Sequence, residues 1–218
     1  MNTIDPGAIV SRAFRIYQEH AAPLLAAAVI VFLIDAVAQY VFDSGFAVLI
    51  ASLIGLIAHT FYQGVVVKLV DDVRDGTLDS SVGGLFSSVT PVVGSLLLIA
   101  ILAGIAIGIG LFLLIVPGLF LMTIWAVVAP AVVIENRGLD AFGRSQELVK
   151  GNGWQVFAVI VIVFLLTVVV GIVGAAIGAA GGDVLRAVVS FVVTVLVAPL
   201  AALAVSVLFF QLRDGNAA

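Results

Sequence analysis

The 218-residue chain contains no cysteine and only two histidines, and charged side chains make up only 10% of it. The missing cysteine excludes a disulfide, a thiolate nucleophile and a sulfur-ligated metal site. The scarcity of charge excludes an ordinary soluble domain, in which about 25% of residues are charged. A net charge of −4, from thirteen acids and nine bases, is too small to indicate nucleic acid or any other strongly charged partner.

The local signatures of common enzymes are also missing from the sequence. It contains no His-Glu-x-x-His, no Gly-x-Ser-x-Gly and no glycine-rich phosphate loop with its lysine. His20 and His59 have no second metal-ligating side chain at a useful spacing. We therefore expect no metal, no cofactor and no catalytic residue, and we predict that the protein is not an enzyme.

In place of charge the chain carries long apolar runs, because 63% of its residues are hydrophobic. A helix of about twenty apolar residues spans about 30 Å, the thickness of the hydrocarbon core of a bilayer. Such runs predict an all-α, polytopic membrane protein. The six predicted spans are Pro23–Phe42, Phe46–Val67, Val92–Val116, Leu119–Ile134, Trp154–Ile177 and Leu185–Leu212.

A short amphipathic stretch precedes each pair of spans. In the first, Asp5 and Pro6 are typical of a helix start, and the helix that follows has Ile9, Val10, Ala13, Phe14 and Tyr17 on one face and Arg12 and Arg15 on the other. The polar, acidic residues from Asp71 to Ser81 are expected to form a loop, and the second stretch, Val82–Val89, follows it. The third stretch is Leu139–Lys150, with Leu139, Phe142 and Val149 on one face and Asp140, Arg144, Glu147 and Lys150 on the other. We expect three amphipathic helices in the membrane interface. For the first, a short helix that covers the end of the bundle in water is the alternative.

The order of surface helix, span, turn and span occurs three times, with Phe14, Phe86 and Phe142 in comparable places. This pattern predicts a pseudo-threefold repeat inside a single integral membrane domain of residues 1–218. The predicted repeat units are residues 5–70, 79–134 and 138–212. The glycine-rich turn at 178–183 and the break at Pro117-Gly118 separate spans within the later units.

The basic side chains predict the orientation of the six spans. Arg186 alone falls on one side, and the other eight bases fall on the opposite side. These eight are Arg12, Arg15, Lys68, Arg74, Arg137, Arg144, Lys150 and Arg213. Because lysine and arginine collect on the cytoplasmic side, we predict a multi-pass protein of the cytoplasmic (inner) membrane with both termini in the cytoplasm.

Charged residues around the third amphipathic stretch are the first site candidates. A tight turn after Glu135 could bring its carboxylate to Arg144, and the pair would hold the surface helix under the bundle. The sharper alternative is a set of contacts to lipid headgroups. Its candidate residues are Arg12, Arg15, Arg137, Arg144 and Lys150.

Polar side chains inside the spans are the second candidates, because an aspartate at the bilayer centre costs about 2.5–3.5 kcal/mol. Asp35 and Gln39 share a face of the first span, and His59 and Gln63 share a face of the second. They could relay protons or a solute, or could simply form hydrogen bonds between helices. If the hairpin turns near Ser44, Asp35 lies opposite Leu53, about 9 Å in depth from His59, which argues against a direct ion pair.

Two further features concern how the spans pack. Small residues recur at helical spacing, which predicts close approach between helices within the chain rather than a dimer face. These residues are Gly104 and Gly108 in one span and Gly174, Gly178 and Gly182 near the last turn. Pro130 and Pro199 are expected to kink the fourth and sixth spans.

One segment resembles a known family. Its residues are Pro117-Gly118, Trp125, Pro130, Glu135-Asn136, Gly138, Ala141, Arg144-Ser145, Leu148, Lys150-Gly151 and Trp154. They are similar to the bacterial and archaeal family named after the membrane domain of glycerophosphoryl diester phosphodiesterase, and to the related YciC-like proteins of unknown function. The N-terminal Gly7 and Ser11-Arg12-Ala13-Phe14 are also similar, but only residues 115–155 are specific.

This resemblance implies a six-helix integral protein of the cytoplasmic membrane, in a family mostly without a known activity. Some relatives carry a fused phosphodiesterase barrel, which these 218 residues do not contain, so the resemblance implies no phosphodiesterase activity for them. It also implies that Glu135 and Arg144 belong to the structural core.

Two functions are compatible with these patterns. The first is an accessory or scaffold module that acts through membrane lipids or a membrane-protein partner in envelope or lipid handling. The alternative is a small transporter or channel that uses Asp35, Gln39, His59 and Gln63. The sequence does not indicate an oligomeric state or a ligand.

Overall fold

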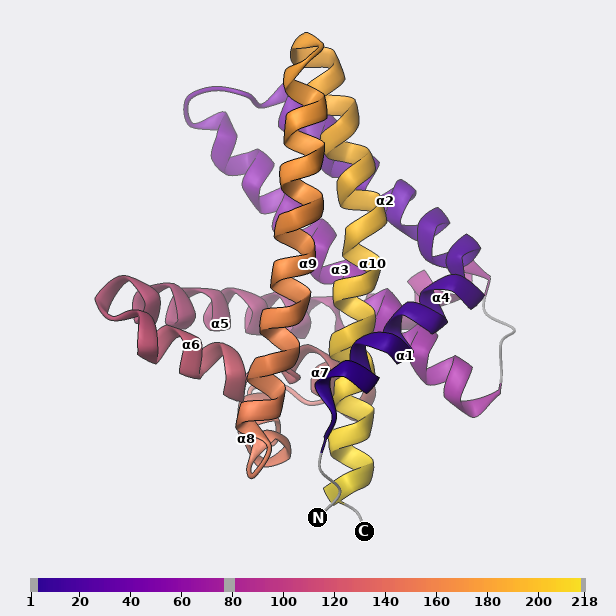
Figure 1. Cartoon of the computed structure of the whole chain (residues 1–218), viewed down its shortest axis with the longest axis vertical. Coiled ribbons are helices and arrows are strands. Elements are labelled where there is room, and N and C mark those ends of the chain that lie inside the picture. Colours follow the sequence, from indigo (N-terminus) through magenta and orange to yellow (C-terminus); the bar gives the residue numbers. More distant parts are fainter. Residues whose placement is uncertain (1–3, 77–80, 217–218) are drawn as a thin grey trace.

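The computed structural model describes residues 4–76 and 81–216, and all regular elements in these ranges are helices (Figure 1). In chain order they are α1 (Pro6–Glu19), α2 (Ala21–Val41), α3 (Ala47–Asp75), α4 (Val82–Val89), the short 3-10 helix η1 (Thr90–Val92), α5 (Val93–Leu113), α6 (Ile115–Ile124), α7 (Val128–Glu135), α8 (Ala141–Val149), α9 (Gly153–Ala179) and α10 (Gly182–Asn216). Within the described ranges, six helical segments are long and apolar enough to cross a membrane. The predicted all-α, multi-pass class is confirmed.

The helices form three hairpins, α2–α3, α5–α6 and α9–α10, whose turns point in different directions (Figure 1). The apolar residues near the turns, such as Phe46, Phe112 and Val184, are exposed. Away from the turns α10 is the central element, because it packs against α1, α2, α3, α7, α8 and α9. The core lies around the second half of α10, where Leu203 and Phe209 are fully buried, and both chain ends lie at this end of the molecule.

Helix α3 extends beyond the predicted span. We expected a polar loop from Asp71 to Ser81, but the helix continues to Asp75 and ends at Gly76, whose positive φ of 70° forms a left-handed cap. Contacts with α10 explain the extension. Arg74 lies 2.9 Å from an Asp214 carboxylate oxygen, and its guanidinium lies 4.3 Å from the centre of the Phe210 ring. Residues 77–80 of the expected loop lie outside the described residues.

The fourth span is not one continuous helix. Its first part, α6, begins at Ile115 after an extended Leu114, and residues 125–127 separate it from α7. Pro117 therefore lies in the first turn of α6 and is not the turn itself, and Pro130 lies in the first turn of α7. Proline is tolerated there because the first turn of a helix has no internal partner for its N–H groups. The expected kink at Pro130 is thus replaced by a break before it. Pro199 lies inside α10, which continues past it.

The face that α1 buries differs in part from the predicted apolar face. Helix α1 buries Ile9, Ala13 and Ile16 against α9 and α10, whereas Phe14 is exposed. The Tyr17 hydroxyl donates a hydrogen bond to the Leu196 carbonyl at 3.2 Å. Burial raises the pKa of this phenol, which keeps the donor protonated. Helix α1 therefore packs its apolar face on α9 and α10 and leaves its polar face exposed.

The three phenylalanines of the predicted repeat are not equivalent. Phe86 packs edge-to-face against Phe61 with ring centres 5.2 Å apart, and Phe142 packs in the same way against Trp125 at 4.8 Å, whereas Phe14 is exposed. The order of a short helix followed by a hairpin does recur three times in the described chain. The repeat thus describes the order of elements, and not the packing of these side chains.

The glycine pairs also differ from expectation. A Cβ added at Gly174 would lie 2.6 Å from Val193 Cγ2, and one at Gly178 would lie 3.1 Å from the Arg186 Cα, so α9 and α10 approach closely there. A Cβ added at Gly104 or Gly108 would have no such atom within 4 Å. The prediction of internal helix packing is therefore wrong for Gly104 and Gly108, which face away from the rest of the chain.

Candidate functional site

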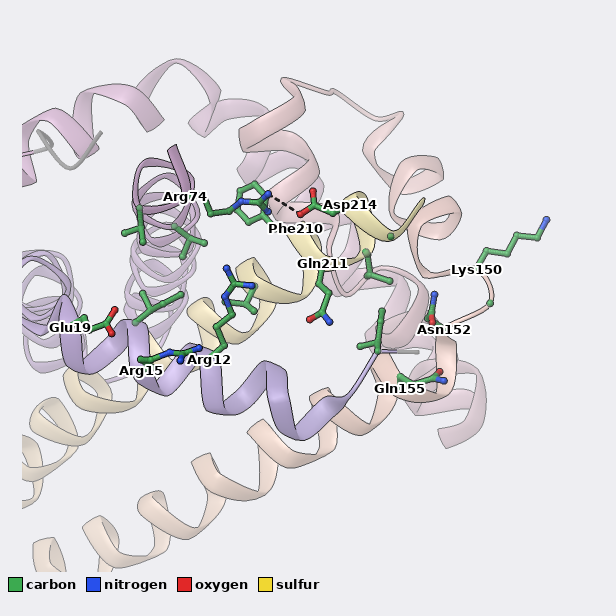
Figure 2. A pocket seen from close by; sticks show the side chains of 18 residues that line it. Arg12, Arg15, Glu19, Arg74, Lys150, Asn152, Gln155, Phe210, Gln211 and Asp214 are labelled. Atoms are coloured by element: carbon green, nitrogen blue, oxygen red, sulfur yellow. Dashed lines mark hydrogen bonds and ion pairs between the residues drawn. The ribbon is translucent and has the colours of Figure 1, made fainter. Parts of the chain in front are cut away.

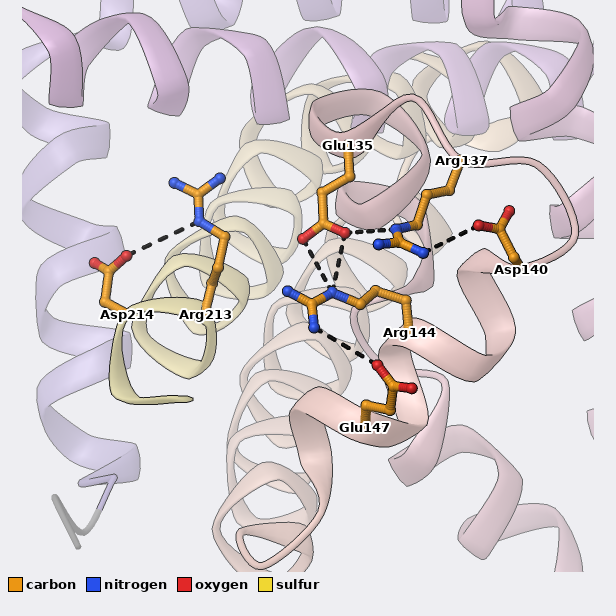
Figure 3. Close-up of polar contacts among 7 residues, drawn as sticks. All are labelled: Glu135, Arg137, Asp140, Arg144, Glu147, Arg213 and Asp214. Carbon is orange, nitrogen blue, oxygen red and sulfur yellow. Dashed lines mark hydrogen bonds and ion pairs between the residues drawn. The ribbon is translucent and has the colours of Figure 1, made fainter. Parts of the chain in front are cut away.

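The residues that carry the family resemblance hold α8 in place. Asn136 follows α7 with a positive φ of 50°, and this left-handed residue turns the chain back toward α8. Arg144 Nε then lies 3.0 and 3.1 Å from the two carboxylate oxygens of Glu135, and Arg137 Nε lies 2.6 Å from one of them (Figure 3). The structure brings Glu135 and Arg144 together at the turn that the sequence indicated.

This ion-pair cluster is complete within the protein. Arg137 also pairs with Asp140 at 3.0 Å, and Arg144 with Glu147 at 3.6 Å. The Glu135 side chain is only 15% exposed, so water screens its two guanidinium partners weakly. Both arginines already have carboxylate partners. The structure therefore does not favour Arg137 and Arg144 as contacts for a lipid headgroup, although the sequence suggested them.

A second contact fixes α8 beneath the break between α6 and α7. The buried Ser145 hydroxyl donates a hydrogen bond to the Ile124 carbonyl at 2.9 Å. Ile124 is the last residue of α6, so its carbonyl has no partner within that helix. Beside this hydrogen bond, the Trp125 ring packs edge-to-face against the Phe142 ring. The sequence did not indicate this contact, because residues 125–127 contain no glycine or proline that would mark a helix break.

The face that α8 buries differs in part from the predicted one. Ala141, Ser145 and Leu148 are fully buried, whereas Leu139 is exposed because the helix begins only at Ala141. Phe142 lies at the edge of the core. Helix α8 is therefore a packed structural element, and its arginine, Arg144, is already paired with Glu135.

A large polar cavity lies at the end of the molecule that holds both chain ends, and we name it the basic cleft (Figure 2). Its volume is about 1090 Å³, and its walls come from α1, the end of α3, the start of α9 and the end of α10. Its charged and amide side chains are those of Arg12, Arg15, Glu19, Arg74, Lys150, Asn152, Gln155, Gln211 and Asp214. Four bases and two acids therefore line it.

The bases of the cleft differ in their partners. Arg74 pairs with Asp214 and is neutralised. Arg12 and Arg15 lie one turn apart on α1, and neither forms an ion pair with any residue in the described part of the chain. Figure 2 shows Lys150 pointing away from the other labelled side chains. Arg12 and Arg15 are thus the available cations of the cleft.

The sequence identified only part of this cleft. Arg12, Arg15 and Lys150 were candidates, but Arg74, Gln155 and Gln211 were not. Arg74 was placed in a loop, and the two glutamines were ordinary residues at the ends of predicted spans. Only the packing of α3, α9 and α10 around one end of the bundle brings them beside α1.

The polar residues of the spans do not share one cavity. Gln39 Nε2 lies 3.4 Å from an Asp35 carboxylate oxygen, and Asp35 packs against Gly55, where an added Cβ would lie 2.8 Å from that oxygen. The sequence placed Asp35 opposite Leu53, whereas in the structure it lies against Gly55, two residues further along α3. His59 stacks on Phe32 with ring centres 4.7 Å apart and makes no ion pair with Asp35 within the described residues.

A second cavity of about 450 Å³ is lined by His59 and Gln63, but not by Asp35 or Gln39. The four candidates thus form two separate pairs. Throughout residues 4–76 and 81–216, no group of three or more His, Asp or Glu side chains could hold a metal ion.

Comparisons with protein-family models, with curated proteins and with solved structures found no match to this chain. The family resemblance therefore rests on the sequence pattern alone, of which residues 115–155 are the specific part. What those residues do in the structure is hold α8 against α6 and α7. A function has to be argued from the basic cleft and from the polar groups of the spans.

Proposed function

We propose that this protein is a non-enzymatic module of the cytoplasmic membrane that binds anionic lipid headgroups in the basic cleft and so takes part in envelope or lipid handling. The proposal rests on one observation. Arg12 and Arg15 both line a cavity of about 1090 Å³ and have no carboxylate partner in the described chain.

The chemistry of the cleft suits a phosphate group. A guanidinium donates two parallel hydrogen bonds to phosphate oxygens, which gives affinity and orientation. The amides of Asn152, Gln155 and Gln211 add donors for the glycerol or sugar oxygens of a headgroup. A free phosphate compound would fit the same groups, so the source of the anion has to be tested.

The position of the cleft favours a lipid as that source. In the six-span arrangement the cleft lies at the side that carries eight of the nine bases, which is the cytoplasmic side by the distribution of lysine and arginine. Trp154 is exposed beside Asn152 and Gln155, and tryptophan is enriched where headgroups meet hydrocarbon. Phe14 on α1 is exposed in the same region of the chain as Arg12 and Arg15.

The double variant Arg12→Gln, Arg15→Gln tests this function. Each base near an anionic surface contributes about 1 kcal/mol, so the loss of two should weaken binding about 30-fold. The measurement is the enrichment of phosphatidylglycerol over phosphatidylcholine around the full chain in nanodiscs of mixed lipid, read by native mass spectrometry. Added inorganic phosphate should not displace the lipid if the headgroup is held as part of a membrane.

Arg186→Gln is the matched control. Arg186 is 65% exposed, lies at the opposite end of the spans and makes only a 3.8 Å contact with Asp183. This variant removes one positive charge, where the double variant removes two, and it does not touch the cleft, so lipid enrichment should not change. Equal enrichment in all three proteins would contradict the proposed function.

The alternative function is a small transporter or channel that uses Asp35, Gln39, His59 and Gln63. It has less support, because only His59 and Gln63 line a common cavity and Asp35 pairs with Gln39 elsewhere. It stays a prediction of the sequence.

A further inference from the structure

The second cavity is a groove within the apolar parts of three helices, and we name it the intramembrane groove. Residues of α3 and α9 line part of its wall, and the remaining lining residues belong to α10, which packs against both helices. His59 and Gln63 come from α3, Thr167 and Gly171 from α9, and Thr194 and Val197 from α10. This groove shares no residue with the basic cleft.

Small residues explain why the groove exists. At Gly174 the α9 and α10 backbones approach so closely that an added Cβ would meet Val193 at 2.6 Å. At Gly171, one turn earlier, an added Cβ would have nothing within 4 Å. The two helices therefore separate at Gly171, and alanines at 198, 201 and 202 leave the α10 side of the space unfilled.

The polar groups of the groove are of two kinds. Thr167 and Thr194 donate their hydroxyl protons to carbonyls of their own helices, and the Tyr62 hydroxyl donates to the Leu24 carbonyl. In the described chain the Gln63 carboxamide has no hydrogen-bond partner, and the His59 imidazole, which packs against the Phe32 ring, has none either. A carboxamide in hydrocarbon without a hydrogen bond is costly, so Gln63 favours a partner from outside the chain.

The lining also limits the charge of that partner. The titratable side chains that line the groove are the His59 imidazole and the Tyr62 phenol. An anionic or cationic group would have no fixed counter-charge there. The rest of the wall is valine, alanine and threonine methyl groups, which suit a hydrocarbon body. The volume of about 450 Å³ lies in the range of small-molecule sites, about 300–1,000 Å³.

We propose that the intramembrane groove binds a lipid-soluble molecule whose head is uncharged and forms hydrogen bonds, such as a long-chain alcohol or amide. The ligand enters sideways from the bilayer. Its head exchanges hydrogen bonds with Gln63 and His59, both of which can donate and accept, and its chain lies along Val197 and the α10 alanines. This site is independent of the anionic headgroups proposed for the basic cleft.

Photolabelling of the full chain in phosphatidylcholine nanodiscs tests the site. The probe is a hexadecanol that carries a diazirine and an alkyne, and the comparison probe is the matching long-chain carboxylic acid at a pH where it is ionised. We expect the alcohol to label peptides of α3, α9 and α10 around the groove, and to do so at least about fivefold more than the carboxylate. Equal labelling by both probes would overturn the chemical class.

Gly171→Leu fills the groove, and Gly104→Leu is its matched control. Both positions are helical and have room for the added side chain, and leucine is the better helix former, so both variants should fold. Labelling at the groove should fall about fivefold or more in Gly171→Leu and should not change in Gly104→Leu. Gln63→Leu, which replaces the carboxamide with an apolar group, should lower alcohol labelling about fivefold through the lost hydrogen bond.

Labelling spread over all exposed apolar surfaces, and equal in Gly171→Leu and Gly104→Leu, would overturn the proposal. The Arg12→Gln, Arg15→Gln protein should label like the parent chain. This last comparison separates a failure of the intramembrane groove from a failure of the basic cleft.

Discussion

Glu135→Ala is expected to lower the free energy of unfolding by about 2–3 kcal/mol. The substitution leaves Arg137 and Arg144 without the carboxylate that lies 2.6 and 3.0 Å from them. Removing one partner of a buried ion pair costs about 3–5 kcal/mol. The cost is smaller here because the two arginine side chains are 38% and 25% exposed to water and keep Asp140 and Glu147 as partners.

Tryptophan fluorescence during thermal unfolding in detergent micelles measures this loss. The chain has only two tryptophans, and Trp125 stacks on Phe142 of α8, so its emission reports the release of that helix. The matched control is Glu147→Ala. Glu147 is 72% exposed and lies 3.6 Å from Arg144, so its loss should change the stability by no more than about 0.5 kcal/mol. Equal losses in the two variants would show that the Glu135 cluster does not hold α8.

Gly118→Val is expected to destabilise the α5–α6 hairpin by about 3 kcal/mol. A Cβ at this position would lie 2.4 Å from Leu111 Cγ and 2.6 Å from the Leu111 backbone nitrogen. A side chain can rotate away, but the backbone of α5 has to move, so the two helices must separate. Gly110 on α5 faces the same contact, because a Cβ there would lie 3.0 Å from the Gly118 Cα.

Gly108→Val is the control for this second prediction. Gly108 lies on α5 and has nothing within 4 Å of an added Cβ, so the same substitution adds no clash. Replacing a helical glycine there should be neutral or slightly stabilising, by up to about 0.5 kcal/mol. The measurement is unfolding by sodium dodecyl sulfate followed by circular dichroism. A loss in Gly108→Val as large as in Gly118→Val would mean that the close helix contact is not the cause.

The Glu135 cluster and the basic cleft are neighbours along the chain. Helix α8 ends at Val149, and the next residues, Lys150 to Asn152, enter the cleft through a turn in which Gly151 has a positive φ of 86°. The position of Asn152 in the cleft therefore depends on where α8 is held. Residues 115–155, which carry the family resemblance, therefore help to position one wall of the basic cleft.

Several features followed from local sequence alone. Asp5 caps α1 as predicted, because its carboxylate accepts a hydrogen bond from the Gly7 N–H at 2.9 Å. The closeness of Glu135 and Arg144 followed from the short turn between them. The spans followed from the length of the apolar runs, because a helix must satisfy its backbone within the bilayer whatever it packs against.

Other features were decided by contacts between distant segments. Helix α3 continues to Asp75 because Arg74 reaches Asp214 on α10, and the break after Ile124 is supported by Ser145 on α8. The basic cleft joins Arg12 of α1 to residues of α3, α9 and α10. No local pattern contains these partners, since they lie tens of residues apart along the chain.

The sequence by itself therefore determined that this chain is all-α and multi-pass, roughly where its apolar spans lie, and which turn would bring Glu135 to Arg144. It did not determine the end of α3 or the break between α6 and α7. Only the tertiary structure decided which faces pack together. Gly104 and Gly174 look alike in sequence, yet one is open and the other touches α10. The physical reason is that lipid chains are as apolar as leucine or valine, so hydrophobicity marks what lies in the bilayer without distinguishing lipid from a neighbouring helix.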